Sequence, residues 1–172
     1  MTPRTTGPDE ARPADSPQDG SPQDDSLAGD EPSLNLEDQF CFTLYSASRA
    51  VTATYRPLLE RLNLTYPQYL VMLVLWQHGT TTVKELVHTL HLDYGTLTPL
   101  LKRLETAGLL TRHRRPEDER VVDITPTEDG LDLRRHALAV PPALGAAFNL
   151  SGQDIQTANA ILTELIHNLT RP

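Results

Sequence analysis

Apolar residues after Asn35 recur every three or four positions, which is the spacing of one face of an α-helix. The first apolar stripe consists of Phe40, Leu44, Ala47, Val51, Tyr55, Leu58 and Leu62. It predicts a long helix that begins near Asn35 and runs to about Arg61. Such a start would place Cys41 about two turns from the N-terminus of the helix.

Two further helix starts are marked by capping boxes, in which a threonine is followed three residues later by glutamine or glutamate. These pairs are Thr65 with Gln68 and Thr82 with Glu85. The first predicts a helix with Pro67 in its first turn that reaches Gln77 and stops at Gly79. The second predicts a short helix to Leu90.

A fourth helix follows, with apolar positions at Leu97, Leu100, Leu101 and Leu104. Because Pro99 has no N–H group, it fits best in a first turn, so we expect the helix to start near Thr96. Gly108 is the expected stop. Residues 109–114 and 120–124 then predict two strands joined by a polar loop at 115–119.

The C-terminal part predicts two more amphipathic helices. The run Thr125-Pro126-Thr127-Glu128 caps the first, which Pro141 and Pro142 must interrupt or end. Ser151 and Asp154 open the second. Its apolar stripe is Ile155, Ala158, Ile161, Leu162, Leu165, Ile166 and Leu169.

The order helix, tight turn, helix and hairpin predicts a mainly α fold with a small β wing, a winged helix-turn-helix. In such a module the second helix enters the DNA major groove. The polar residues on that helix are Thr96, Thr98, Lys102 and Arg103. The hairpin concentrates basic residues suited to phosphates or a narrow minor groove, namely Arg112, His113, Arg114, Arg115 and Arg120. The alternative is a helical domain with a solvated basic loop.

The flanking helices exceed what a small winged helix needs. We therefore expect a DNA-binding part at about 66–126 and dimerisation helices at about 36–62 and 127–169. A two-fold homodimer would present two reading helices to a pseudo-palindromic operator of double-stranded DNA. Alternatively, these helices pack only within the chain.

Composition divides the chain near residue 34. The chain has 172 residues and a formal net charge of −8. Residues 1–33 are proline-rich, contain eight acids against two arginines and predict a disordered acidic tail. Residues 34–172 then form one domain with a net charge of only −2, which leaves room for a basic face.

The remaining features argue for a cytoplasmic protein. No run of 18 apolar residues exists, which argues against a membrane span. Residues 1–12 lack the apolar segment of a secretory signal. Cys41 is the single cysteine. It cannot form an intrachain disulfide, which fits a reducing compartment.

The segment from Lys84 to Gly130 resembles the MarR (multiple antibiotic resistance regulator) family. The resemblance lies in the leucine pattern of residues 97–110, in Asp118-x-Arg120 and in Thr127-Glu128-x-Gly130. It implies a DNA-binding regulator in which Arg120 enters the minor groove, steadied by Asp118. No cofactor is implied.

A narrower resemblance is to the organic-hydroperoxide-sensing repressors of that family, known as OhrR. It rests on three long runs, residues 40–49, 64–71 and 92–104. It implies that organic hydroperoxides oxidise Cys41, that oxidation releases the DNA, and that Tyr55 and Tyr66 bind the reduced cysteine. The regulated gene would encode a hydroperoxide-reducing enzyme.

The residues around Cys41 are consistent with this chemistry. Only a thiolate attacks a peroxide, and tyrosine hydroxyls can stabilise one by donating hydrogen bonds. On a helix, Tyr45 and Tyr55 fall within about 40° of the direction of Cys41, but Tyr55 lies roughly 21 Å along the axis. If Tyr55 binds the sulfur, it must come from the partner subunit, as the resemblance implies. Phe40, Phe42 and Leu44 would favour an apolar peroxide.

The lone cysteine also predicts a one-cysteine mechanism. Sulfenic acid on Cys41 would react with a small thiol, cyclise to a sulfenamide or overoxidise. Four alternatives remain open: Cys41 as a buried packing residue, a cysteine peroxidase, a repressor that binds a phenolic ligand, and a metal sensor. The candidate ligands for a metal are His88, His91 and Asp93, although surface or supporting roles are commoner for such histidines.

Overall fold

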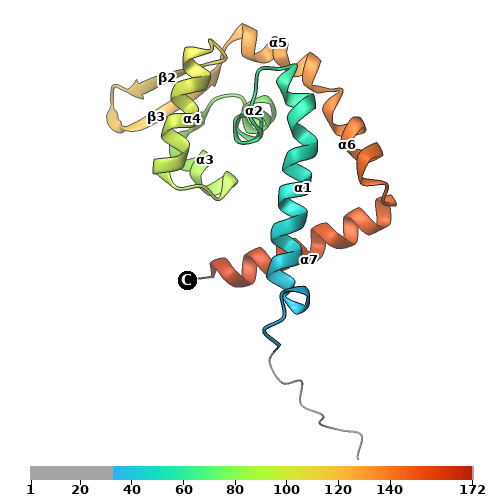
Figure 1. Cartoon of the computed structure of the whole chain (residues 1–172). Helices are drawn as coiled ribbons and strands as arrows, with labels where there is room; N and C mark the ends of the chain where they lie inside the picture. The colour runs from blue at the N-terminus through green and yellow to red at the C-terminus, as the bar shows by residue number, and fades with distance from the viewer. Residues whose placement is uncertain (1–32, 172) are drawn as a thin grey trace, which may run out of the picture. The chain divides into compact units, whose positions relative to one another are not determined.

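The computed structural model describes residues 33–171, so the predicted acidic tail lies, except for Ser33, outside the described residues. The elements are a 3₁₀ turn at Leu36–Asp38, α1 (Phe40–Glu60), α2 (Tyr66–His78), β1 (Thr81–Thr82), α3 (Val83–Leu90), α4 (Tyr94–Thr106), β2 (Leu110–Arg115), β3 (Asp118–Pro126), α5 (Glu128–Ala137), α6 (Val140–Phe148) and α7 (Gly152–Thr170). All elements from α1 onward belong to one unit, and the 3₁₀ turn belongs to a separate N-terminal unit. The mainly helical fold with a small β wing is confirmed (Figure 1).

The sheet is a hairpin with a short third strand at its edge. The strand order is β1-β3-β2, and both pairs are antiparallel. The predicted five-residue loop of the hairpin is wrong, because both strands extend into it and leave only Pro116 and Glu117 as the turn. A register shift at Arg114 and Arg115 absorbs the mismatch between the two strands. β1 has only two residues, which are too few for an alternating pattern to predict a strand from the sequence.

The core lies around α2, which contacts α1, α3, α4, α5 and β3. Most of α2 is buried and, apart from its ends, only the side with Leu73 and Gln77 is exposed, which explains its nearly continuous apolar sequence. From α4, Leu97, Leu101 and Leu104 complete this core, and Leu110 and Ile124 come from the sheet. The hydrophobic face of α4 therefore points inward, and its polar face is left toward solvent.

The long first helix begins later than predicted. Residues 36–38 form a separate 3₁₀ turn, and Gln39 has an extended backbone, with φ −86° and ψ 108°. The Gln39 amide donates hydrogen bonds to the backbone oxygens of Ser33 and Asn35, at 2.7 and 3.1 Å. Local bonds of this kind compete with helix formation. As a result, Cys41 is the second residue of α1 rather than a residue two turns inside it.

The start of α4 near Thr96 is also wrong. Asp93 caps the helix by accepting a hydrogen bond from the Thr96 N–H at 2.8 Å, so α4 begins at Tyr94. Pro99 is then the sixth residue and lies in the second turn. The lost N–H bond of Pro99 costs less here because its usual acceptor is the carbonyl of Gly95, near the exposed start of the helix.

The other helix signals hold. In both capping boxes the glutamine or glutamate side chain accepts a hydrogen bond from the threonine N–H, at 2.8 Å in Thr65–Gln68 and 2.7 Å in Thr82–Glu85. Gly79 ends α2 with φ 72°. Thr127 caps α5, and Ser151 caps α7.

The C-terminal region holds one more helix than predicted. α5 ends at Ala137, and Pro141 and Pro142 lie in the first turn of α6, where proline is well tolerated. α6 packs on α1 through Val140 and Leu144. In contrast, α7 buries none of its residues in the chain. No helix within residues 33–171 combines the length and apolar character needed to cross a membrane.

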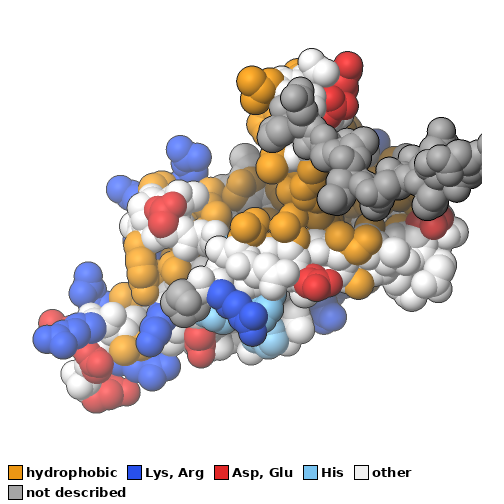
Figure 2. Space-filling model, turned by 90° about the horizontal axis from the view of Figure 1, so that it is seen from below, with side chains coloured by type: hydrophobic (Ala, Val, Ile, Leu, Met, Phe, Trp, Pro, Cys, Tyr) orange, Lys and Arg blue, Asp and Glu red, His pale blue; other side chains and the backbone are white. Residues whose placement is uncertain are grey.

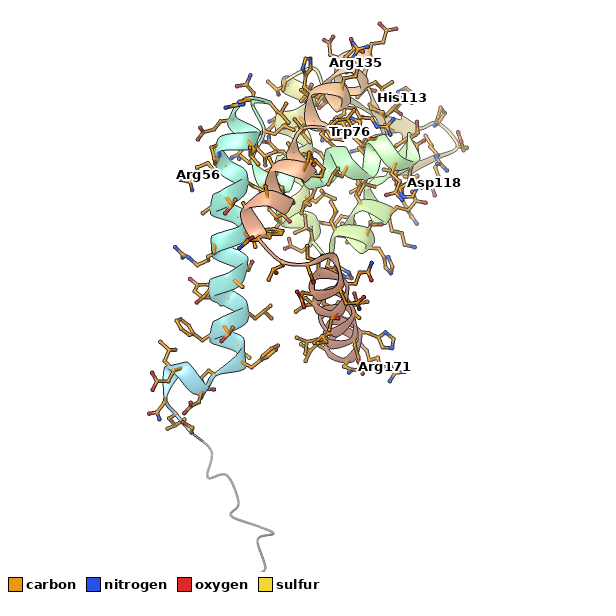
Figure 3. All side chains as sticks on the ribbon, turned by 90° about the vertical axis from the view of Figure 1, so that its right-hand side faces the viewer. Arg56, Trp76, His113, Asp118, Arg135 and Arg171 are labelled. Carbon is orange, nitrogen blue, oxygen red and sulfur yellow. The ribbon has the colours of Figure 1, made fainter. Side chains whose placement is uncertain are left out.

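Gly130 is a point of close contact between α5 and the rest of the fold. Its carbonyl accepts a 2.7 Å hydrogen bond from the Trp76 Nε1–H group, which ties α5 to α2. Figure 3 labels Trp76 at this junction. A side chain at this position would overlap the carbonyl oxygen of Leu109. The Thr127-x-x-Gly130 pattern therefore serves packing between helix α5 and the turn that ends α4.

We expect Gly130→Ala to lower the free energy of unfolding by about 1–3 kcal/mol, because the added methyl group forces the backbone near Leu109 to move. Gly145→Ala in α6 is the matched control. A methyl group there meets no atom within 4 Å, so the change should raise stability by about 0.5–1 kcal/mol. Urea unfolding monitored by Trp76 fluorescence measures both. Equal effects of the two substitutions would contradict the close packing of Gly130.

Candidate DNA-binding face and thiol site

The polar face of α4 is open to solvent. All four predicted recognition residues are exposed, namely Thr96, Thr98, Lys102 and Arg103. Burial of Leu97, Leu101 and Leu104 on the opposite side holds this face outward. The structure therefore brings these four residues together, as the sequence predicted.

The hydroxyls of Thr96 and Thr98 already donate hydrogen bonds to neighbouring residues at the start of α4. The Thr96 hydroxyl donates to the Asp93 carboxylate at 2.8 Å, and the Thr98 hydroxyl donates to the backbone oxygen of Tyr94 at 2.7 Å. Each therefore offers only acceptor lone pairs outward in this arrangement. The side chain of Tyr94 is 55% exposed at the first turn of the same helix. Sequence reasoning missed Tyr94 because it was placed in the preceding turn.

Asp118 and Arg120 lie beside the turn of the hairpin, and Figure 3 labels Asp118 there. The Asp118 carboxylate accepts a hydrogen bond from the Arg120 N–H at 3.1 Å. It thus fixes the backbone that carries Arg120 and does not pair with the guanidinium. Arg114 donates to the backbone oxygen of Glu119 at 3.1 Å, across the same turn.

Two of the predicted DNA-binding arginines are in ion pairs. Arg112 contacts Glu105 at 2.6 Å, which links the start of β2 to α4. Arg115 makes two 2.8 Å hydrogen bonds to the Asp123 carboxylate, which joins the two strands of the wing. These arginines lower the pKa of Glu105 and of Asp123 through hydrogen bonding. Both pairs orient the wing, so Arg112 and Arg115 are less free than Arg120 to bind phosphate.

A cleft of about 660 Å³ separates the first turns of α3 and α4 from the wing. Its charged lining residues are Lys84, Arg112, Arg114, Arg115, Glu119 and Arg120. Figure 2 shows Lys and Arg side chains gathered toward the end of the molecule that carries the hairpin, with some acids among them. Although the whole chain is acidic, this face therefore carries a local excess of positive charge.

Cys41 is exposed on the first turn of α1. Packing in the core of its own chain is therefore not its role. Its neighbours Phe40 and Phe42 are 56% and 38% exposed. The first N–H groups of a helix have no partner within it, and they favour a nearby negative charge. The late start of α1 thus places the Cys41 thiol nearer to these N–H groups than the sequence predicted.

Tyr45 lies one turn after Cys41 and is joined to Arg49. The Arg49 guanidinium donates a 3.0 Å hydrogen bond to the Tyr45 hydroxyl. Its Cζ atom lies 5.6 Å from the centre of the Tyr45 ring, within the range of a cation–π interaction. The sequence analysis did not single out Arg49, although its spacing of four residues from Tyr45 is the signal for such a contact.

Tyr55 and Tyr66 meet at the other end of α1. Their ring centres are 4.5 Å apart, and Tyr69 lies 5.9 Å from Tyr55. Burial, helped by the two neighbouring tyrosines, raises the pKa of Tyr55 to about 12. Burial also raises the pKa of Tyr66. Both hydroxyls thus stay protonated at neutral pH and can donate hydrogen bonds.

The four predicted thiol-site residues form two groups within the chain. Cys41 and Tyr45 lie in the first two turns of α1, and Tyr55 and Tyr66 lie together near its C-terminal end. The 14 residues from Cys41 to Tyr55 correspond to about 21 Å along a helix. One chain therefore does not bring the tyrosine pair to the sulfur.

The metal alternative gains no support from the described part of the chain. Residues 33–171 contain no group of three or more His, Cys, Asp or Glu side chains placed to hold a metal ion. Asp93 accepts the cap hydrogen bonds of α4, and His91 forms the C-cap of α3. The His91 N–H also donates to the backbone oxygen of His88, so both histidines take part in the end of α3.

Comparison with known proteins agrees with this architecture. A family model described as Transcriptional regulator SarA/Rot matches residues 53–135. The organic hydroperoxide resistance transcriptional regulator of Bacillus subtilis (strain 168) is 48% identical over 136 residues, which are 79% of this chain and 92% of that protein. The chain belongs to the MarR family, in the branch of the organic hydroperoxide resistance regulators.

Solved structures support the same assignment. Reduced AbfR bound to DNA has a TM-score of 0.66 and 33% identity, covering 79% of this chain and 95% of that one. A MarR-family regulator from Rhodococcus sp. RHA1 has a TM-score of 0.69 and 25% identity, covering 77% and 96%. Each similarity extends over most of this chain and most of the compared chain. The two structures therefore support the whole architecture and not the wing alone.

The raised pKa of Tyr55 predicts a loss of stability at alkaline pH. An unfolded tyrosine releases its proton near pH 10, whereas folded Tyr55 keeps its proton until about pH 12. The folded state therefore binds more protons in this window, and the free energy of unfolding falls as pH rises through it. In Tyr55→Phe this contribution is absent. We therefore expect that raising the pH from neutral to above 10 lowers the free energy of unfolding of the wild type more than that of Tyr55→Phe. Urea unfolding of both proteins at the two pH values measures this. A pH-independent difference would contradict the assignment.

Proposed function

We propose that this MarR-family regulator is a cytoplasmic transcriptional repressor that senses organic hydroperoxides through Cys41 and releases its operator when Cys41 is oxidised. The observation that carries the proposal is the exposed thiol on the first turn of α1, flanked by Phe40 and Phe42. A reactive cysteine must be accessible, and an apolar surround favours an organic peroxide over hydrogen peroxide. The hydroperoxide resistance regulator of Bacillus subtilis provides the family context.

We further propose that the protein forms a homodimer. α7 buries no residue in its own chain, and its Ile161, Ile166 and Leu169 are 56%, 44% and 76% exposed. At the start of α1, Phe40 and Phe42 are also exposed. An apolar surface of this kind marks an interaction site. Pairing of two copies through these helices would cover it, and would bring Tyr55 and Tyr66 of one subunit toward Cys41 of the other.

In the reduced state, the proposed dimer binds a pseudo-palindromic operator. α4 of each subunit would enter the major groove with Thr96, Thr98, Lys102 and Arg103 toward the bases and phosphates. Arg120 at the wing would reach the minor groove or the neighbouring phosphates. Reduced AbfR, which shares this fold, has been solved bound to DNA.

The proposed oxidation is a two-electron step. The Cys41 thiolate attacks the terminal oxygen of R–O–O–H, so that an S–O bond forms as the O–O bond breaks. Sulfur is oxidised to sulfenic acid, and the alkoxide takes a proton and leaves as the alcohol ROH. Because Cys41 is the single cysteine, the sulfenic acid reacts next with a small thiol, with a backbone nitrogen or with more peroxide.

A DNA-binding titration on the region upstream of the chain's own gene tests the proposal. Wild type and Cys41→Ser are each measured reduced, and again after one equivalent of cumene hydroperoxide with a small thiol present. We expect both reduced proteins to bind and only the oxidised wild type to be released. Dithiothreitol should then restore binding of the wild type.

Other results of that titration would exclude the proposal in distinct ways. Continued binding by oxidised wild type would reject hydroperoxide sensing and favour a regulator with another ligand. In a separate assay with excess peroxide, catalytic consumption of many equivalents would favour a cysteine peroxidase. Release of Cys41→Ser as well would show that the signal acts elsewhere on the protein.

The ion pairs of the wing predict different effects for two of its arginines. Arg120→Gln should weaken operator binding by about 1–3 kcal/mol per subunit. It should also lower the slope of log affinity against log salt by about two for the dimer. Arg115→Gln should leave that slope unchanged, because Arg115 pairs with Asp123 and orients the wing. Affinity measured at several salt concentrations separates the two. A lower slope for Arg115→Gln would show that Arg115 contacts phosphate.

A further inference from the structure

The cleft between α3, α4 and the wing carries more positive charge than its own chain neutralises. Its charged lining consists of five cations and one acid, namely Lys84, Arg112, Arg114, Arg115, Arg120 and Glu119. Arg112 and Arg115 are held by the ion pairs described above. The other cations, Lys84, Arg114 and Arg120, pair with no carboxylate among residues 33–171. A concave surface lined by one sign of charge focuses the electric field and attracts ligands of the opposite sign.

Most of the negative charge of the chain lies in one short stretch of the sequence. Residues 9–31, here called the acidic segment, contain eight Asp and Glu residues and a single basic residue, Arg12. Eight negative charges and one positive charge leave the segment with −7, out of −8 for the whole chain. The segment lies outside the described residues, and its charge is the chemical property by which it can recognise a surface.

Covalent geometry places the cleft within reach of the acidic segment. Residue 9 lies 31 residues before Phe40, where α1 begins, and a chain of that length spans up to about 100 Å. For comparison, the 21 residues of α1 correspond to about 31 Å. Attachment to the same chain also raises the effective concentration of the segment at the cleft to the millimolar range. Individually weak ion pairs then suffice to keep the cleft occupied.

We propose that the acidic segment binds the cleft formed by α3, α4 and the wing, where Lys84, Arg114 and Arg120 contact its carboxylates, and that it competes there with DNA phosphates. This rests on the proposed function, since the same face would bind the operator. Duplex DNA carries a denser line of charge, one per about 1.7 Å, so it can displace the segment. Because operator and unrelated DNA both need the cleft, the segment lowers the affinity for both by the same factor.

The test compares the full-length wild type with a neutralised variant that has Asp→Asn or Glu→Gln at all eight acids of the segment. The affinity of each reduced protein for a duplex without an operator is measured at about 50 and about 300 mM salt. At the lower salt, neutralisation should raise the affinity about fivefold to thirtyfold, which corresponds to several exposed ion pairs that are each weak. At the higher salt the gain should fall below about twofold, because salt screens exposed charges.

Two double variants locate the effect on the protein. Arg114→Gln with Arg120→Gln removes two cations of the cleft, and Arg61→Gln with Arg134→Gln removes the same charge from exposed positions outside it. Neutralisation of the segment should raise DNA affinity much less in the first background than in the wild type, and equally in the second. Equal gains in all three backgrounds would overturn the proposal and indicate general repulsion between the segment and DNA.

Occupancy of the cleft is measured separately and without DNA. Backbone amide NMR spectra of the full-length wild type and the neutralised variant are compared at low salt. The differences should be concentrated in residues that line the cleft, such as Thr98 and Val121, and should fade as salt is added. Identical spectra of residues 33–171, or differences confined to another face, would overturn the proposal.

Failure of the proposed function gives a different pattern of results. If neither protein binds DNA at any salt concentration, DNA binding itself is wrong, and the NMR comparison still decides whether the segment occupies the cleft. If the segment occupies the cleft but neutralisation leaves DNA affinity unchanged, the competition is wrong and DNA binding stands. Continued operator binding by oxidised wild type would reject hydroperoxide sensing alone, because every measurement on the segment uses reduced protein.

Discussion

An α-helix rises about 1.5 Å for each residue, and this fixed rise governs the arrangement of the thiol site. α1 is a helix of 21 residues with Cys41 in its first turn and Tyr55 near its C-terminal end. No rotation about the helix axis shortens the separation of about 21 Å between them. Leu59 near the C-terminal end is the one fully buried residue of α1, whereas residues 40–43 at the end that carries Cys41 are all exposed. A second copy is the proposed packing partner of that end.

The DNA-reading part follows from a different constraint, which is the burial of α2. Every neighbouring element packs against this apolar helix, and α4 does so through three leucines that leave its polar face outward. Glu105 and Asp123 then orient the wing by pairing with Arg112 and Arg115. These surface pairs contribute little stability, since exposed ion pairs are worth about 0–1 kcal/mol. Their effect is geometric, because the Arg112 pair holds the hairpin against α4 and the Arg115 pair joins the two strands of that hairpin.

The two parts meet through α1 and α5. α1 packs on α2 and α6, while α5 is tied to α2 by the bond from Trp76 to Gly130. In the proposed dimer, a change of the subunit contacts near Cys41 can therefore reach the proposed DNA-reading helices through packed helices and needs no flexible linker. Population shift between two dimer arrangements is the physical form that the proposed switch takes.

Local signals in the sequence determined most helix ends and the character of the fold. The capping boxes at Thr65 and Thr82 and the stop at Gly79 depend on contacts within four residues, so a sequence pattern contains them completely. Tertiary structure decided what depends on distant partners, namely the pairing of β1 with β3 and the ion pairs of the wing arginines. The sequence named Cys41 and its tyrosines and gave the separation of Cys41 from Tyr55, but the contact of Tyr55 with Tyr66 and the exposure of Cys41 required coordinates. The burial of a residue depends on which other residues pack against it in space. The order of residues along the chain does not contain that information.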